Sequence, residues 1–382
     1  MPQSYDVIVL GLGGMGSAAL WHLAARGVRV LGLERFTPPH DHGSSHGQSR
    51  IIRQAYYEDP AYVPLLFRAY ELWDDLERAT GRRLLLPTGG VFIGPPDADL
   101  IAGSLRSARE HSLPHQVLSA AEIRQRWPVL HADPSEIGVF EDRSGVLLVE
   151  ECVRAHVDAA LRRGAEAHFE EPVLRWSARP GGDGVVVETK QGRYEAARLV
   201  IAGGAWNPGL LGDLGLPFRV ERQVLYWFDP GPQRALFALG RLPIWAWEHP
   251  DITFFYGFPD LGAPGVKAAF HHGGETTSAD QIRRTVSAEE TAAFRAVLRR
   301  FVPALDVPPT QAATCMYTNT PDDHFVIGLH PQYPQVALAA GFSGHGFKFC
   351  AVVGEVLADL ARSGSTRHPI GLFAPTRFQG QH

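Results

Sequence analysis

The chain lacks an apolar run long enough to cross a bilayer, and it lacks any cluster of basic residues. Its formal net charge is -5, so neither nucleic acid nor a membrane surface is expected as a partner. The beginning, Met1 to Asp6, has no basic start and no apolar core of a signal peptide. A small molecule is therefore the expected partner.

Cysteine is scarce as well. The three cysteines, Cys152, Cys315 and Cys350, are too few and too scattered for a disulfide framework or a metal site. We therefore expect no metal, and a reducing cytoplasm suits such a chain.

What is present describes an ordinary globular protein of some size. Of the 382 residues, 45% are hydrophobic and 20% are charged, which excludes a mainly disordered chain. A chain of this length exceeds what one core usually supports. We expect two units of unequal size and an α/β fold, α+β overall.

The first 34 residues carry the clearest pattern. A strand over residues 5–10, a helix over residues 17–26 and a second strand over residues 28–33 follow in order. Between the first strand and the helix, Gly11, Gly13 and Gly16 match G-x-G-x-x-G, with Gly14 and Met15 inside the motif. This strand-turn-helix context predicts a Rossmann-type dinucleotide site, with the pyrophosphate at the helix N-terminus.

An acidic residue stands where a ribose contact is expected. Glu34 lies 18 residues after Gly16 and is followed by Arg35. A carboxylate at this spacing accepts hydrogen bonds from ribose hydroxyls and disfavours a 2′-phosphate. The alternative is a surface glutamate after a glycine turn. The motif does not distinguish FAD from NAD.

The rest of the chain predicts a second, mostly antiparallel sheet, because residues 221–270 are dense in aromatic residues that alternate as strands do. The other expected elements are a loop over 38–49, a helix over 63–78, strands over 184–189 and 199–202, a helix over 281–301, an irregular region over 315–324, a strand over 335–340 and a closing helix over 349–362.

Three further segments resemble one family. Residues 49–53 (SRIIR), 315–322 (CMYTNTPD) and 341–348 (GFSGHGFK) are similar to the monomeric sarcosine oxidase and N-methyltryptophan oxidase family. The resemblance implies a discontinuous FAD-binding domain over 1–85, 145–220 and 315–382. The remaining segments, 86–144 and 221–314, would form the substrate domain.

The resemblance also implies which residues meet the cofactor. Cys315 matches the cysteine that carries FAD covalently, although a lone cysteine is usually a core residue. Cys152 and Cys350 have no matching role and are assigned to the core. The implied FAD-binding residues are Gly11, Gly13, Gly14, Met15, Gly16, Glu34, Arg35, His46, Ser49, Arg50, Cys315, Gly344, Gly346 and Lys348.

On the substrate side, Arg53 and Lys348 match a pair that holds a substrate carboxylate, a task suited to a guanidinium and an ammonium. Tyr256 and His271 match residues that line the substrate cavity. Lys267 matches a lysine that promotes reaction with O₂.

Each assignment has a structural alternative. Arg53 could form an ion pair with Glu58 or Asp59, and Lys348 could be solvated at a helix start. Tyr256 and His271 could be an ordinary sheet aromatic and an ordinary histidine.

The implied function is FAD-dependent oxidation of the C–N bond of a small amino acid with a secondary amine, by a monomer that uses O₂ and gives hydrogen peroxide. The stretch from Trp245 to Phe255 departs from the family pattern with a one-residue shift. Sarcosine, N-methyltryptophan, proline and pipecolate all stay open as substrates. A flavin dehydrogenase with another acceptor, an NAD-dependent dehydrogenase and a non-catalytic binding protein are the alternatives.

Overall fold

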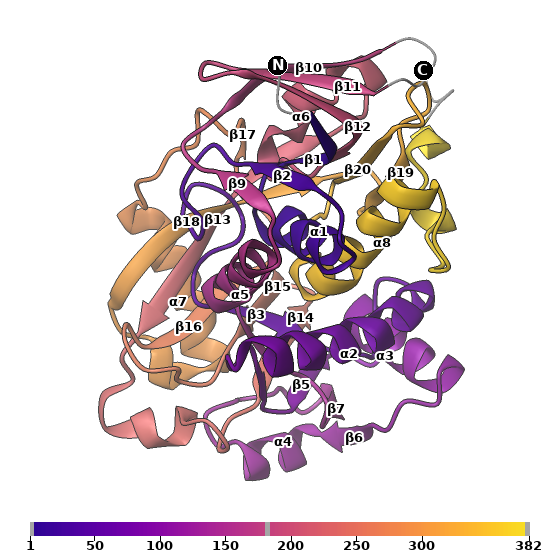
Figure 1. Cartoon of the computed structure of the whole chain (residues 1–382). Coiled ribbons are helices and arrows are strands. Elements are labelled where there is room, and N and C mark those ends of the chain that lie inside the picture. The colour runs from indigo at the N-terminus through magenta and orange to yellow at the C-terminus, as the bar shows by residue number, and fades with distance from the viewer. Residues whose placement is uncertain (1–3, 180–183, 379–382) are drawn as a thin grey trace.

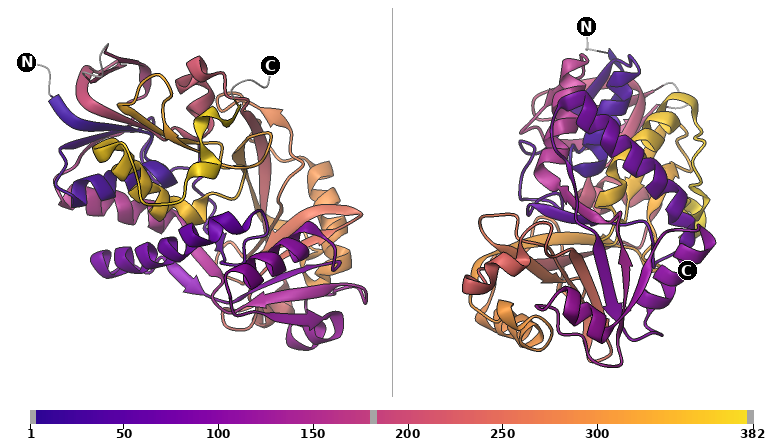
Figure 2. Two further views of the ribbon diagram at one scale, coloured as in Figure 1. Left: turned by 90° about the vertical axis from the view of Figure 1, so that its right-hand side faces the viewer. Right: turned by 90° about the horizontal axis from the view of Figure 1, so that it is seen from below.

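A computed structural model describes residues 4–179 and 184–378 of the chain. Two large sheets and their helices make up the two halves of the molecule (Figures 1 and 2). No helix of the described residues is long and apolar enough to span a membrane.

The first half is built on an eight-stranded sheet. β1 pairs in parallel with β2 on one side and with β12 on the other, and β12 pairs in parallel with β20. The strands of this sheet are β1 (Ser4–Leu10), β2 (Val30–Leu33), β9 (Glu166–His168), β10 (Val173–Ala178), β11 (Val185–Thr189), β12 (Arg193–Ile201), β19 (Val326–Leu329) and β20 (Val336–Ala340).

Helices pack together beside this sheet. The helix α1 (Gly14–Ala25) contacts both α5 (Val149–Arg162) and α8 (Cys350–Ser363), and α2 (Val63–Thr80) lies against α8 (Figure 1). A Cβ at Gly354 of α8 would lie 2.5 Å from the Cβ of Ala18. The small residue therefore permits the close approach of α1 and α8, which places the start of α8 beside the glycine motif.

The second half is a nine-stranded sheet, antiparallel except for the parallel pair of β5 and β14. Alternate aromatic residues from its strands pack into a core with α7. Its strands are β5 (Gly90–Gly94), β6 (Gln116–Ser119), β7 (Ile137–Glu141), β13 (Arg219–Phe228), β14 (Ile244–His249), β15 (Ile252–Gly257), β16 (Val266–Phe270), β17 (Thr276–Thr277) and β18 (Pro309–Asn319), and its helices are α3 (Asp99–Glu110), α4 (Ala120–Arg126) and α7 (Ala288–Phe301).

A small third sheet and a short helix complete the fold. The strand β8 (Gly145–Leu148) pairs with β3 (Ser49–Ile52) and with β4 (Leu85–Pro87). The helix α6 (Asn207–Leu210) follows β12. β3 directly precedes Arg53, so this sheet positions the segment that carries several of the predicted site residues.

The α/β class and the mostly antiparallel second sheet are confirmed. Two local predictions are wrong. The helix expected over 281–301 begins only at Ala288, because Ser287 and Glu290 form a capping box there. The region expected to be irregular from Cys315 is a strand as far as Asn319, since β18 pairs along β13, with Cys315 opposite Gln223.

The domain division stays a prediction, but its boundaries can be placed on these elements. The boundary at residue 315 falls inside β18, which belongs to the second sheet. The boundary at residue 85 falls at the start of β4, in the small third sheet.

Candidate functional site

A cavity of about 400 Å³ opens beside the glycine motif. Gly11 has φ +83°, and a Cβ there would lie 2.7 Å from the carbonyl oxygen of Ala202, so the turn needs glycine. A Cβ at Gly16 would overlap the carbonyl oxygen of Gly11. Gly13 has more space around it than Gly11 and Gly16, since a Cβ there would meet only Ser45 Oγ, at 3.5 Å. Backbone thus lines the cavity at this point.

Glu34 ends β2 with its carboxylate turned to the same turn. Its Oε2 accepts a hydrogen bond from the backbone N–H of Leu12 at 2.6 Å, and its Oε1 accepts one from Phe36 at 3.1 Å. Arg35 forms an ion pair with Asp280 at 2.8 Å. Glu34 and Arg35 both line the cavity, together with Gly11, Gly13, Gly14, Met15, Arg50, Gly344 and Gly346 from the predicted set.

Arg50 organises the loop before β3. Its guanidinium donates to the carbonyl oxygens of His46 at 2.9 Å, Ser49 at 2.8 Å and Ser44 at 2.7 Å, and lies 3.5 Å from Cys315 Sγ. Cys315 is fully buried. Burial and the Arg50 charge lower the pKa of His46 to about 3, so this imidazole is neutral.

The residues around this cavity fit a large polar cofactor. The buried atoms His46 Nε2, Ser49 Oγ and Thr318 Oγ1 have no hydrogen-bond partner among the described residues. Buried polar atoms are normally paired, because an unpaired one costs about 1–3 kcal/mol. A bound dinucleotide with many donors and acceptors suits such atoms, and Thr318 lines the cavity itself.

A second cavity of about 60 Å³ adjoins the first. Arg50, Tyr317, Gly344 and Phe347 line both, so the two spaces are neighbours. The second cavity is also lined by Arg53, Tyr256, His271 and Lys348, which the resemblance assigned to the substrate, and by Ile51, Tyr57, Glu58, Phe92, Ala246, Phe254, Phe258 and His345.

Two buried cations meet at this second cavity. Arg53 donates to Glu58 Oε2 at 2.6 Å, so the expected ion pair exists, and its guanidinium lies 4.6 Å from the ring centre of Tyr57. Lys348 is only 6% exposed, which excludes a solvated residue. Its Nζ donates to the carbonyl oxygen of His345 at 2.7 Å. Burial and the neighbouring Arg53 lower the pKa of Lys348 to about 7.

Three other polar side chains that line this cavity, Tyr256, His271 and Tyr317, are uncharged. Burial, helped by His272, holds the pKa of His271 well below its usual value, so the imidazole is neutral at physiological pH. Tyr317 Oη lies 3.4 Å from His271 Nδ1. Burial raises the pKa of Tyr256. Neutral polar groups therefore line this cavity together with Arg50, Lys348 and the Arg53–Glu58 ion pair.

Lys267 lies outside the linings of both cavities. It belongs to β16 and is 2% exposed. Its Nζ donates to the carbonyl oxygens of Gly47 at 2.7 Å and Ser49 at 2.9 Å. Burial, followed by the Arg50 charge, lowers the pKa of Lys267 well below its usual value.

A family model described as "FAD dependent oxidoreductase" matches residues 6–360. The chain belongs to this family. It is 53% identical over 380 residues to a monomeric sarcosine oxidase of Streptomyces avermitilis, covering 99% of this chain and 98% of that protein. It is 34% identical over 379 residues to an N-methyl-L-tryptophan oxidase of Yersinia pestis, covering 99% and 100%.

Solved structures agree with this family. NikD, described as an unusual amino acid oxidase essential for nikkomycin biosynthesis, superposes with a TM-score of 0.86 at 27% identity, covering 98% of each chain. The expected resemblance and the Rossmann-type FAD fold are thereby confirmed. As a member of the FAD-dependent oxidoreductase family, the protein depends on FAD.

Several lining residues of this FAD-dependent oxidoreductase were not predicted. Gly203, Gly204 and Trp206 line the larger cavity because β12 ends beside β1, and the glycine pair after a strand was the available signal. Val173 and Leu174 gave no signal at all, since only the sheet brings β10 to the cavity. Others are Ser44, Ser45, Tyr317, Thr318, Phe342 and Phe347. Cys152 and Cys350 lie in the core as expected, and Cys350 also reaches the cavity.

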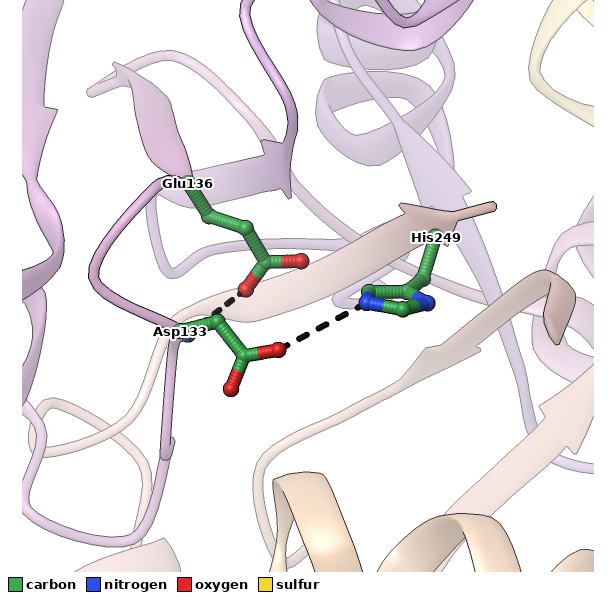
Figure 3. A group of neighbouring side chains, drawn as sticks. All are labelled: Asp133, Glu136 and His249. Carbon is green, nitrogen blue, oxygen red and sulfur yellow. Dashed lines mark hydrogen bonds and ion pairs between the residues drawn. The ribbon is translucent and has the colours of Figure 1, made fainter. Parts of the chain in front are cut away.

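One other cluster has the composition of a metal site. Asp133, Glu136 and His249 bring their ligand atoms within 4.8 Å of one another (Figure 3). A cation is already there, because Arg300 Nη2 lies 2.6 Å from Asp133 Oδ2 and 3.1 Å from His249 Nε2. Glu136 accepts a hydrogen bond from Trp247. We interpret this cluster as a structural ion-pair network.

Proposed function

We propose that the protein oxidises the C–N bond of a small amino acid carrying a secondary amine, with O₂ as electron acceptor. One observation carries this proposal: the small cavity next to the larger one is lined by two buried basic residues, Arg53 and Lys348, together with uncharged polar side chains. The relatives named sarcosine oxidase and N-methyl-L-tryptophan oxidase support it.

The division of labour follows from these groups. When bound, FAD would supply the redox chemistry: two-electron oxidation of the C–H bond next to the substrate nitrogen, giving an imine that water hydrolyses, and two-electron reduction of O₂ to hydrogen peroxide. The side chains of the chain bind and orient the substrate.

Arg53 and Lys348 bind the substrate carboxylate in this proposal. A guanidinium offers two parallel donors to a carboxylate, and the ammonium adds a compact charge. Glu58 already neutralises Arg53, and although burial opposes ionisation, the Arg53 charge lowers the pKa of Glu58. The second positive charge, that of Lys348, therefore remains for an incoming anion.

The uncharged side chains that line the smaller cavity suit an uncharged amine. His271 carries no positive charge near neutral pH, and Tyr256 keeps its proton, since burial raises its pKa. Neither group holds an ammonium in place. The site would thus select the deprotonated amine, whose nitrogen lone pair is needed when the neighbouring C–H bond is oxidised.

Cys315 is the residue we propose for covalent attachment of FAD. Its Sγ is fully buried and lies 3.5 Å from the Arg50 guanidinium, which also lines the FAD cavity. Acid precipitation of the purified protein tests the linkage. Yellow colour should stay in the pellet of the wild type and move to the supernatant for Cys315→Ser. Free flavin from the wild type would refute covalent attachment.

A flavin dehydrogenase with another acceptor is the second candidate. Lys267 favours an oxidase, because a protonated lysine bound to the loop before β3 would stabilise the anion that forms as O₂ is reduced. Turnover of N-methyl and cyclic amino acids should release peroxide in proportion to substrate consumed. Turnover with an artificial dye but not with O₂ would make the dehydrogenase the better description.

We also propose that the protein acts as a monomer in the cytoplasm. The relatives called monomeric support the first point. The cysteines at 152, 315 and 350, all unpaired in the described part of the chain, support the second. Light scattering should give a mass near the 41.8 kDa of one chain.

A further inference from the structure

Lys267 is held by an unusual turn. Its two hydrogen-bond acceptors are the carbonyl oxygens of Gly47 and Ser49, which flank Gln48. Gly47 has φ +89° and Gln48 has φ +66°, and the left-handed region is uncommon for a residue with a side chain. A Cβ at Gly47 would lie 2.6 Å from Leu225 and 3.6 Å from Lys267 Nζ. The turn is therefore shaped closely around the ammonium.

One carboxylate holds this turn from the side of α5. Glu150 Oε1 accepts hydrogen bonds from the backbone N–H groups of Gly47 at 2.7 Å and Gln48 at 3.1 Å. The N–H of Val149 donates to the carbonyl oxygen of Gln48 at 3.1 Å. Three hydrogen bonds thus tie the turn to the first turn of α5.

The second sheet holds the same turn from the other side. Trp227 Nε1 donates to Gln48 Oε1 at 2.8 Å, and Gln48 Nε2 donates to the carbonyl oxygen of Ala263 at 2.6 Å. The turn is clamped between α5 and the sheet that carries Lys267. A shift of either partner would move the carbonyl oxygens that bind the ammonium.

Charge points to the same residue. Burial and the Arg50 guanidinium both lower the pKa of Lys267, whereas the negative charge of Glu150 raises it. Its direct acceptors are neutral carbonyl groups. Glu150 is therefore the carboxylate that offsets the Arg50 charge at this buried amine.

We propose that Glu150 is a positioning residue for Lys267, holding the 47–49 turn whose carbonyl oxygens bind its Nζ and placing a negative charge behind that turn. The inference rests on the proposed function, in which Lys267 promotes the reduction of O₂. Glu150 itself lines neither cavity, so it acts through the turn.

The chain offers a matched control. Glu151 is the next residue of α5, but it pairs with Arg82 at 2.8 Å and with Arg154, away from the turn. Glu150→Gln keeps an oxygen that can accept the two N–H groups and removes only the charge. Glu151→Gln removes the same charge from the same helical turn. Equal thermal unfolding of the two variants would show that folding is not at issue.

Stopped-flow measurements on the flavin-loaded protein separate the two halves of the reaction. Glu150→Gln should slow reoxidation by O₂ about 10-fold, the effect of one pKa unit on the protonated fraction of a group, with anaerobic reduction by substrate unchanged. Glu151→Gln should leave both rates unchanged. Equal reoxidation rates for the two variants would overturn the inference.

A direct titration of Lys267 gives a readout independent of turnover. The chain has three lysines, Lys190, Lys267 and Lys348, so NMR of protein with ¹³C-labelled lysine yields three signals, and Lys267→Met assigns one. The pKa of Lys267 should fall in Glu150→Gln and stay in Glu151→Gln. If Lys267→Met reoxidised like the wild type, the proposed role of Lys267 would fail; if only Glu150→Gln did, the inference alone would fail.

Discussion

The two adjoining cavities differ in the groups that line them, backbone in one and side chains in the other. The larger one is lined beside the glycine motif by backbone, and its shape depends on positions such as Gly11 and Gly16 that admit no side chain. The smaller one is lined mostly by side chains, and Arg50, Arg53, Glu58 and Lys348 are the charged ones among them. A site built from backbone tolerates few substitutions, and the same backbone arrangement can bind many cofactors. In a site built from side chains, single substitutions can change charge, size or hydrogen bonding separately. Substitutions in the two cavities should therefore fail in different ways.

The largest effect is expected at the glycine motif. Gly16→Ala would make a methyl group overlap the carbonyl oxygen of Gly11. We therefore expect no flavin to copurify and the free energy of unfolding to fall by about 3 kcal/mol. Flavin absorbance and chemical denaturation measure the two effects.

Gly212→Ala is the control for that change, because its Cβ would meet nothing within 4 Å. Normal flavin content in Gly16→Ala would contradict the backbone description of the larger cavity.

Arg53 comes next, and its effect should depend on the substrate. Removing it alone would leave Glu58 buried without its cation, so the test uses Arg53→Met together with Glu58→Gln. We expect kcat/KM for amino acids to fall about 1000-fold, the cost of about 4 kcal/mol for a lost charge-assisted contact. Amines without a carboxylate should change little. A loss of kcat/KM of similar size for amino acids and for amines without a carboxylate would argue against a carboxylate clamp. So would an unchanged kcat/KM for amino acids in both Glu58→Gln and the double variant.

The pH dependence of anion binding should report Lys348. Its pKa is about 7, so the ammonium is charged below pH 7 and loses its charge as the pH rises. The Kd of propionate, a carboxylate without an amine, should therefore increase about 10-fold above pH 7, the effect of one pKa unit. Flavin difference spectra measure this Kd. Lys348→Met should bind propionate weakly at all pH values, and a pH profile equal to that of the wild type would exclude Lys348 as the titrating group.

The smallest effect is expected at the wall of the smaller cavity. Phe254 stacks on Tyr57 with 5.7 Å between ring centres and lies 4.9 Å from the His271 ring. Phe254→Ala enlarges the cavity, so the ratio of kcat/KM for N-methyltryptophan to kcat/KM for sarcosine should rise. We expect a rise of about 10-fold, a size typical of specificity changes caused by pocket volume. Phe255 points into the core on the other face of β15, and Phe255→Leu should leave this ratio unchanged.

The same contrast explains what the sequence could reveal. Gly11, Gly13, Gly16 and Glu34 lie within one strand-turn-helix-strand unit, so spacing alone located them. Arg53, Tyr256, His271 and Lys348 come from separate segments that only the fold brings to one cavity, and nothing but resemblance to a family indicated them. The late start of α7 depended on a capping box.

Glu150 shows the limit most clearly. It is a glutamate at the start of an amphipathic helix, like its neighbour Glu151, and the sequence makes no distinction between them. The difference appears only when the 47–49 turn reaches α5 and presents two N–H groups to one of the two carboxylates.

The distribution of lysines has a practical consequence. Lys267 and Lys348 are buried, whereas Lys190 is exposed in the turn between β11 and β12. Lysine-directed reagents should therefore attach a label or a solid support at Lys190 and spare the other two side chains. Attached through that hairpin, the protein would be immobilised by the sheet of the first half, with the second sheet turned toward the solution.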